Sequence, residues 1–108
     1  AGAAGGQIDP TQIRMTDLSK TVQDPLLAKV RSTLRREYGF PRDTKKNFGI
    51  PAIYSTEPLR YPDANPVCEN EQGPAGLSCA GFGSSVCVTS AFGMAAAARA
   101  IRFITETN

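Results

Sequence analysis

The final stretch of the sequence, residues 84–105, reads as a helix that is apolar on nearly every side. Ser84 or Ser85 can cap its first amides, and its first charged residues are Arg99 and Arg102. Such a pattern predicts a long helix that is buried on several sides. A chain of 108 residues with one other helix and two short strands offers little surface to bury it. We therefore expect this helix to pack against protein that lies outside the chain.

Two residues inside this segment bear on how it packs. Gly93 lies near the middle of the helix, where glycine costs about 1 kcal/mol relative to alanine. We interpret it as a position that another element approaches closely. Cys87 lies one turn into the helix, and we interpret it as a core residue.

The composition is typical of one small globular domain, with 41% hydrophobic and 20% charged residues. The net charge of +2 is too small to indicate nucleic-acid binding by itself. The sequence contains no histidine, which excludes a Ser-His-Asp triad or a His-ligated zinc site within the chain. No uninterrupted apolar run approaches the roughly 18 residues of a membrane span, so we expect no membrane contact.

The three cysteines, Cys68, Cys79 and Cys87, are odd in number and irregularly spaced. Such a set does not describe a disulfide framework, and it lacks the close pairs of a zinc site. We therefore expect reduced thiols, no metal and a cytoplasmic location.

Regular structure is predicted in three further segments. Residues 12–17 alternate polar and apolar side chains, which is the period of a half-buried strand. Residues 50–55 form a short apolar run that predicts a second strand. Between them, Asp24 and Pro25 are typical of a helix start, and Gly39 is typical of a helix end. The apolar stripe of this helix comprises Leu27, Val30 and Leu34.

Two stretches lack any periodicity. Residues 1–6, AGAAGG, are either a flexible tail or the end of a buried strand followed by a glycine turn. Residues 58–80 contain four prolines and read as a long irregular loop, a feature that is usually functional or disordered in a small domain.

Four motifs together resemble one protein family: Gly5–Ile13 (GGQIDPTQI) followed by Thr16–Leu18 (TDL), Gln23–Leu26 (QDPL), Tyr54–Glu57 (YSTE) and Cys79–Ser84 (CAGFGS). Their order and spacing are similar to the C-terminal half of the bacterial tRNA threonylcarbamoyladenosine dehydratases. That family belongs to the ThiF/MoeB/HesA superfamily, which is related to the ubiquitin-activating enzymes.

The resemblance implies an α/β fold, with residues 1–108 forming the C-terminal half of a doubly wound ThiF/MoeB-like domain with few strands and a long buried C-terminal helix. It implies an enzyme that uses ATP and Mg²⁺ to adenylate the carboxyl group of threonylcarbamoyladenosine in tRNA, which then cyclises with loss of AMP. The glycine loop that binds ATP would lie before residue 1. We therefore expect the chain to be inactive alone, and its partners to be tRNA, its own N-terminal half and a second copy in a homodimer.

Cys79 is the first candidate site residue. It follows the long loop and precedes a helix start, where the helix dipole lowers the pKa of a thiol. The resemblance suggests a thiol or persulfide acceptor, served by a cysteine desulfurase or a sulfur-acceptor protein. The alternative is a small residue packed under the loop, and Cys68 is interpreted as an incidental exposed thiol.

Two carboxylates are further candidates. Glu57 follows the second strand, where a catalytic carboxylate can reach a cleft in an α/β sheet; the alternative is a solvated strand end or a salt-bridge partner. Asp9 is expected to orient the glycine-rich turn. The resemblance also implies that carbonyl oxygens of this turn hold a monovalent cation.

Six basic residues gather within residues 31–46, where Glu37 and Asp43 are the only acidic residues. Such a cluster is suited to tRNA phosphates, and the alternative is a solvated helix face and loop. The predicted tRNA-binding residues are Arg31, Arg35, Arg36, Arg42, Lys45 and Lys46.

Two other functions remain open. The apolar final helix also suits a dimerisation module, and Cys79 suits a sulfur-relay or partner-binding module. Both would belong to a ThiF/MoeB protein of the molybdopterin- or thiamine-biosynthesis type.

Overall fold

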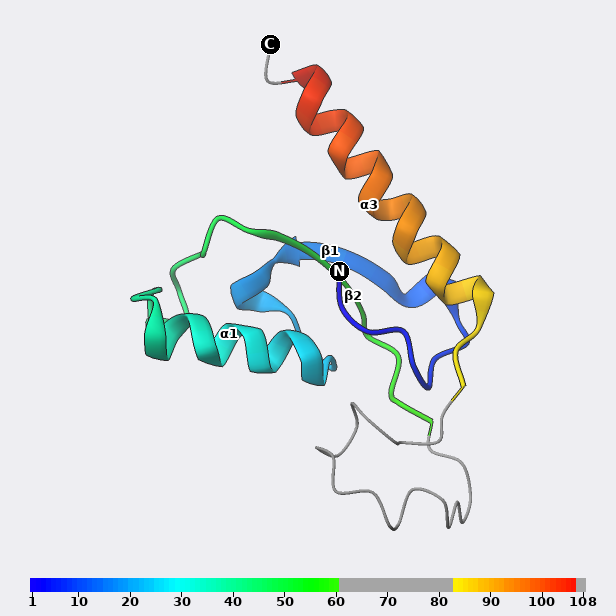
Figure 1. Cartoon of the computed structure of the whole chain (residues 1–108), viewed down its shortest axis with the longest axis horizontal. Coiled ribbons are helices and arrows are strands. Elements are labelled where there is room, and N and C mark those ends of the chain that lie inside the picture. The colour runs from blue at the N-terminus through cyan, green and yellow to red at the C-terminus, as the bar shows by residue number, and fades with distance from the viewer. Residues whose placement is uncertain (61–82, 107–108) are drawn as a thin grey trace.

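The computed structural model describes residues 1–60 and 83–106 (Figure 1). Most of the predicted 58–80 loop lies outside these residues, as do Cys68 and Cys79. The described elements are two 3-10 turns, η1 (Pro10–Gln12) and η2 (Leu18–Lys20), two strands, β1 (Ile13–Asp17) and β2 (Pro51–Ser55), and two helices, α1 (Pro25–Glu37) and α3 (Val86–Glu106).

The two strands pair antiparallel, with Ile13 opposite Ser55 and Asp17 opposite Pro51. Both strands and both helices lie where the sequence predicts them, within two residues at each end. The α/β class is therefore confirmed. Within the described residues the sheet has two strands, so the doubly wound sheet stays a prediction about a larger domain.

Strand β2 separates two small hydrophobic clusters, because successive side chains of a strand point to opposite faces. Ala52 and Tyr54 pack with Leu18 and Leu27 beside α1. Ile53 packs on the other face with Val88 and Phe92 of α3. All of Ala52–Ser55 is buried, so β2 is covered on both faces, although within the described residues only β1 pairs with it.

Helix α1 is capped as the sequence predicts. Asp24 Oδ1 accepts a hydrogen bond from the Leu27 amide at 3.0 Å, and Pro25 occupies the first helical position. Gly39 ends the helix with φ +70°, a conformation that favours glycine. The predicted stripe is wrong at Val30, which is exposed, because only the Leu27 and Leu34 side of α1 contacts the cluster around β2.

Helix α3 has the predicted extent, but within the described chain most of it is exposed, so its expected burial would need protein outside the chain. Only Val88 and Phe92 are buried, whereas Met94 is 73% exposed and Ile101 is 62% exposed. The first turns of α3 lie against the strands, and the rest of the helix extends away from them (Figure 1). The described part of the chain has no second surface to cover the remaining apolar faces.

Two local predictions in α3 fail for the same reason. Cys87 is exposed instead of buried, since it faces away from the strands that contact Val88. A Cβ added at Gly93 would meet nothing within 4 Å, so no described element approaches that glycine.

The length and composition of α3 also meet the minimal criterion for a membrane-spanning helix. Its best window has a mean hydropathy of 1.3, and 11% of that window is buried. Arg99 and Arg102 lie in this helix, but its mean hydropathy remains in the range of membrane-spanning helices. The criterion is weak for a single helix, and the expected absence of membrane contact stays a prediction.

Candidate functional site

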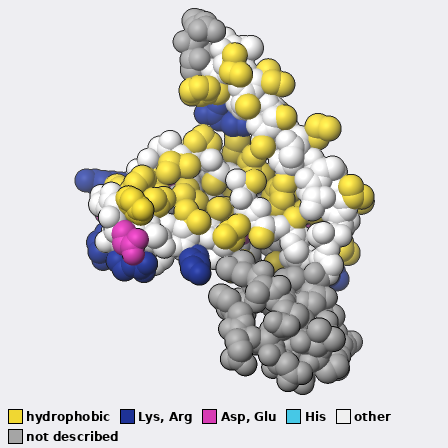
Figure 2. All heavy atoms as spheres, viewed as in Figure 1, with side chains coloured by type: hydrophobic (Ala, Val, Ile, Leu, Met, Phe, Trp, Pro, Cys, Tyr) yellow, Lys and Arg dark blue, Asp and Glu magenta, His cyan; other side chains and the backbone are white. Residues whose placement is uncertain are grey.

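The predicted basic residues gather at the C-terminal end of α1 and on the loop that follows it, residues 38–50, where Lys and Arg side chains cluster on the left of Figure 2. Four of them line one pocket of about 400 Å³, and Ala28 and Ser32 complete its wall. The structure therefore brings together Arg31, Arg35, Arg36 and Arg42. Lys45 and Lys46 lie on the loop outside this pocket.

Two of the pocket arginines are held in place by the protein. Arg31 Nη1 donates to Thr21 Oγ1 at 2.8 Å and to the Thr21 carbonyl at 3.3 Å. Arg35 Nε donates to the Pro41 carbonyl at 3.0 Å, and its guanidinium lies 5.1 Å from the ring centre of Phe48. These contacts fix the direction of both side chains, because each removes rotamer freedom from a long flexible residue.

The other basic residues are exposed. Arg36 forms an ion pair with Glu37 at 3.3 Å, with both side chains more than half exposed. Arg42, Lys45 and Lys46 have no side-chain hydrogen bond or ion pair within the described residues. Exposed cations of this kind are available to an anionic partner.

The loop that carries these lysines is anchored by Asp17, at the end of β1. Its carboxylate accepts hydrogen bonds from the amides of Phe48 (2.7 Å), Gly49 (2.7 Å) and Ile50 (3.0 Å). Ser19 adds its amide at 3.0 Å and its hydroxyl at 2.5 Å. Burial of the carboxyl raises the pKa of Asp17, but the Ser19 hydroxyl and these amides outweigh burial and hold the pKa well below its ordinary value.

The sequence prediction missed this anchor. The spacing of Asp17 and Ser19 is typical of a local side-chain turn, which was the available signal. The bonds to residues 48–50 have no local signature, because they join segments that are distant in sequence.

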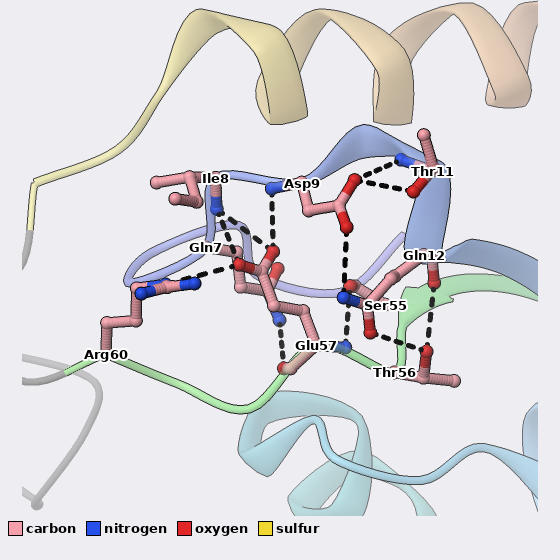
Figure 3. Close-up of polar contacts among 9 residues, drawn as sticks. All are labelled: Gln7, Ile8, Asp9, Thr11, Gln12, Ser55, Thr56, Glu57 and Arg60. Atoms are coloured by element: carbon pink, nitrogen blue, oxygen red, sulfur yellow. Dashed lines mark hydrogen bonds and ion pairs between the residues drawn. The ribbon is translucent and has the colours of Figure 1, made fainter.

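Glu57 forms a second anchor, between β2 and the N-terminal segment, and this one is buried (Figure 3). Glu57 is 2% exposed, and its Oε1 accepts from the amides of Asp9 at 2.9 Å and Ile8 at 3.0 Å. Arg60 Nε lies 3.5 Å from Glu57 Oε2 and forms an ion pair with it. Burial opposes ionisation, but the amides of Asp9 and Ile8, with Arg60, lower the pKa of Glu57 below its ordinary value.

The prediction that Glu57 is a salt-bridge partner matches the structure, because its carboxylate pairs with Arg60. The same carboxylate also accepts hydrogen bonds from backbone amides. Its catalytic role stays a prediction. Cys79, the other catalytic candidate, lies outside the described residues.

Asp9 orients the turn at the start of η1, which follows the glycine-rich turn that it was expected to orient. Its Oδ1 accepts from the amide and hydroxyl of Thr11 at 2.9 and 2.6 Å, and its Oδ2 accepts from Gln12 at 3.1 Å (Figure 3). These bonds, from the Thr11 hydroxyl above all, lower the pKa of Asp9.

The N-terminal segment, residues 1–6, is also held in place. Gly2 donates to the Ile53 carbonyl at 2.8 Å, and Gly6 adopts φ +76° in the turn. The flexible-tail alternative is therefore wrong; the glycine turn is present, but residues 1–4 before it form no strand.

Two observations bear on whether the chain could hold a cation. Among residues 1–60 and 83–106, no group of three His, Cys, Asp or Glu side chains could hold a metal ion. Gln7 Oε1 is buried without a hydrogen-bond partner in the described chain, and such an oxygen suits a monovalent cation. One oxygen does not make a coordination shell, so the expected cation at this turn stays a prediction.

A second pocket, of about 480 Å³, lies between the strands and the far half of α3. Its apolar lining includes Met15, Pro51, Ile53, Ala100 and Phe103, and Arg99 also contributes. Figure 2 shows hydrophobic side chains along this side of the molecule.

Comparison with known proteins places these features in context. The chain is 50% identical over 101 residues to the tRNA threonylcarbamoyladenosine dehydratase of Haemophilus influenzae, a match that covers 93% of this chain. It is 45% identical over 106 residues to the dehydratase of the same name from Escherichia coli. The expected resemblance to the tRNA threonylcarbamoyladenosine dehydratases is confirmed. No protein-family model matches the sequence.

The solved structures agree with the dehydratase resemblance. The E. coli enzyme in complex with AMP superposes with a TM-score of 0.77 at 40% identity and covers 98% of this chain. Its complex with ATP gives a TM-score of 0.75. The chain spans 38% of the length of the H. influenzae dehydratase and 37% of the E. coli chain, so the greater part of these relatives has no counterpart in it.

Proposed function

We propose that this chain is the C-terminal part of an ATP-dependent tRNA threonylcarbamoyladenosine dehydratase, and that it is inactive without the remainder of that enzyme. The observation that carries this proposal is the match to two dehydratases over more than nine-tenths of the chain. The exposed apolar faces of α3 support the second half of the proposal, because they suit a surface that the remainder of the enzyme would cover.

ATP and Mg²⁺ are assigned to the remainder of the enzyme. The E. coli relative was crystallised with AMP and with ATP. Within the described part of this chain, no glycine-rich loop leads directly from a strand into a helix, which is the arrangement that cradles nucleotide phosphates. These residues therefore do not fit the nucleotide, and we derive no reaction step from them. The complete enzyme would adenylate the threonylcarbamoyl carboxyl group, cyclise it and act in the cytoplasm.

The contribution of this chain is contact with the substrate RNA. The six basic residues on α1 and the following loop supply positive charge on one end of the molecule. RNA phosphates bind such surfaces with a strong dependence on salt concentration. We assign Arg31, Arg35, Arg36, Arg42, Lys45 and Lys46 to this contact.

A reconstitution experiment tests the proposal. The chain is mixed with a separately expressed N-terminal half of a dehydratase, ATP, Mg²⁺ and tRNA that carries threonylcarbamoyladenosine. Cyclic product, measured by mass spectrometry of digested nucleosides, is expected only when both polypeptides are present. Product formed by this chain alone, or no product from a pair shown to associate, contradicts the proposal.

A second candidate function is self-association, and the exposed side chains of α3 favour it. Met94, Ile101 and their neighbours offer an apolar face that a second copy could cover as a homodimer. The sulfur-relay function, with a desulfurase or a sulfur-acceptor partner, depends on Cys79, and no described residue adds support for it.

A further inference from the structure

The pocket between α1 and the following loop carries positive charge and no negative charge in its lining. Four guanidinium groups and two small residues line it, and no carboxylate does. Like charges held together repel one another, so the arrangement is most favourable when an anion occupies the pocket. Guanidinium groups match the oxygens of phosphate particularly well, because their N–H donors form a planar fork.

Two of the arginines in the pocket are preorganised by hydrogen bonds to the protein. Arg31 donates hydrogen bonds to Thr21 through Nη1 only, and Arg35 donates to the Pro41 carbonyl through Nε only. Within the described residues the other N–H groups of both guanidiniums have no hydrogen-bond partner. Two donors are thus directed by the fold, so less side-chain entropy is lost on binding.

Arg36 and Arg42 complete the pocket as adjustable groups. Both are exposed, and the Arg36–Glu37 pair is too exposed to hold Arg36 firmly. A phosphate can therefore attract both side chains toward the two fixed arginines.

We propose that this pocket binds a single phosphodiester of tRNA, an inference that rests on the proposed function. Phosphate chemistry could also come from a free anion or a nucleotide. The surroundings favour a polymer, because the positive charge continues beyond the pocket onto exposed Lys45 and Lys46. A strand of RNA can contact the pocket with one phosphate and the lysines with the next.

The test uses the full chain and fluorescently labelled tRNA, with affinity measured by anisotropy across a salt series. The variants are Arg36→Gln, Arg42→Gln and the double variant. Lys29→Gln is the matched control, because Lys29 lies on the same helix but lines a different, apolar depression with Leu26 and Val30. Circular dichroism verifies that each variant is folded.

Each arginine variant is expected to weaken tRNA binding about tenfold at low salt and to lower the slope of log K against log salt by about 0.7 to 0.9, which corresponds to one phosphate. The double variant is expected to be only slightly weaker than either single variant, because both arginines contact the same group. Lys29→Gln is expected to change affinity less than twofold. An equal loss in Lys29→Gln and Arg42→Gln, or unchanged binding in both arginine variants, overturns the pocket.

Two further arms identify the source of the phosphate and separate this inference from the proposed function. ATP and inorganic phosphate are titrated into the wild-type chain and Arg42→Gln; binding that depends on Arg42 while tRNA affinity does not overturns the RNA assignment. In the reconstituted dehydratase, cyclic product with unaltered tRNA affinity in the variants overturns the pocket alone. The expected tRNA signature without any cyclic product from polypeptides shown to associate leaves the pocket standing and overturns the proposed function.

Discussion

The carboxylate of Asp17 accepts a hydrogen bond from the Phe48 amide at 2.7 Å, although 31 residues separate the two in sequence. Together with Gly49 and Ile50, this bond fastens the end of the basic loop to β1. Phe48 in turn packs on Arg35 and on Phe40. One partly buried acid thus holds the segment that presents Arg42, Lys45 and Lys46.

The first prediction is that Asp17→Asn destabilises the chain. Asparagine lacks the negative charge and places an N–H₂ group among backbone donors, so about 2 kcal/mol of the free energy of unfolding is lost. Urea denaturation followed by circular dichroism measures it. Asp43→Asn is the control, because Asp43 is exposed and its carboxylate accepts from the neighbouring Lys45 amide; its effect should stay below about 1 kcal/mol. Equal losses in the two variants would contradict the anchoring role.

The second prediction is that the chain loses stability at acidic pH. The pKa values of Asp17 and Glu57 are lowered in the folded chain relative to ordinary values of 3.8 and 4.5. The unfolded chain therefore binds more protons in this range, and stability rises with pH up to about 5. Below that, it is lost as pH falls toward the folded pKa values. A melting temperature that stays flat between about pH 5 and pH 2 would refute this expectation.

The third prediction is that Glu57→Gln loosens the N-terminal turn. Replacing the buried acceptor weakens the bonds from the Ile8 and Asp9 amides at a cost of about 2 kcal/mol. Amide hydrogen exchange by NMR should show faster exchange at both amides. Arg60→Gln is the comparison, since its side chain is 66% exposed and such pairs contribute less than about 1 kcal/mol. Protection retained in Glu57→Gln would show that other contacts hold the turn.

The fourth prediction is that two glycine-to-alanine changes have opposite signs. At Gly93 a Cβ meets nothing within 4 Å, so alanine should stabilise the helix by up to about 1 kcal/mol. At Gly2 a Cβ would lie 1.8 Å from Asp24 Oδ2. Alanine should therefore displace the carboxylate that caps α1 and lower the melting temperature. If Gly93→Ala instead destabilises a reconstituted dehydratase, the remainder of the enzyme packs there.

The fifth prediction addresses the apolar face of α3. Light scattering at rising concentration should show self-association of the isolated chain, and Met94→Lys with Ile101→Lys should abolish it. Both residues are exposed, so the substitutions should not alter the fold. Thr105→Lys provides a matched increase in charge on the same helix. A chain that remains monomeric at all concentrations argues against the homodimer.

Local signals predicted most of the secondary structure. The alternation in residues 12–17 and the capping residues Asp24 and Pro25 act within a few positions of the elements they define, so the sequence pattern is sufficient there. The Asp9 turn was predictable for the same reason, since its partners are Thr11 and Gln12.

Burial and long-range bonds could not be predicted in the same way. The exposure of α3 depends on which surfaces are present to cover it, and its composition alone indicated burial. The partners of Glu57 lie 48 and 49 residues away in sequence, and no spacing rule connects them. The fixing of Arg31 by Thr21 depends likewise on how η2 packs beside α1.

The position of β2 between the two hydrophobic clusters has a consequence for how the chain can fold. A shift of one residue in its pairing with β1 would exchange the sides, sending Ile53 toward α1 and Tyr54 toward α3. Both clusters would then be mismatched at once, so the strand alignment and the docking of the two helices must be acquired together. Truncating α3 should accordingly degrade the order of the loop beside α1, even though the two do not touch through a shared cluster.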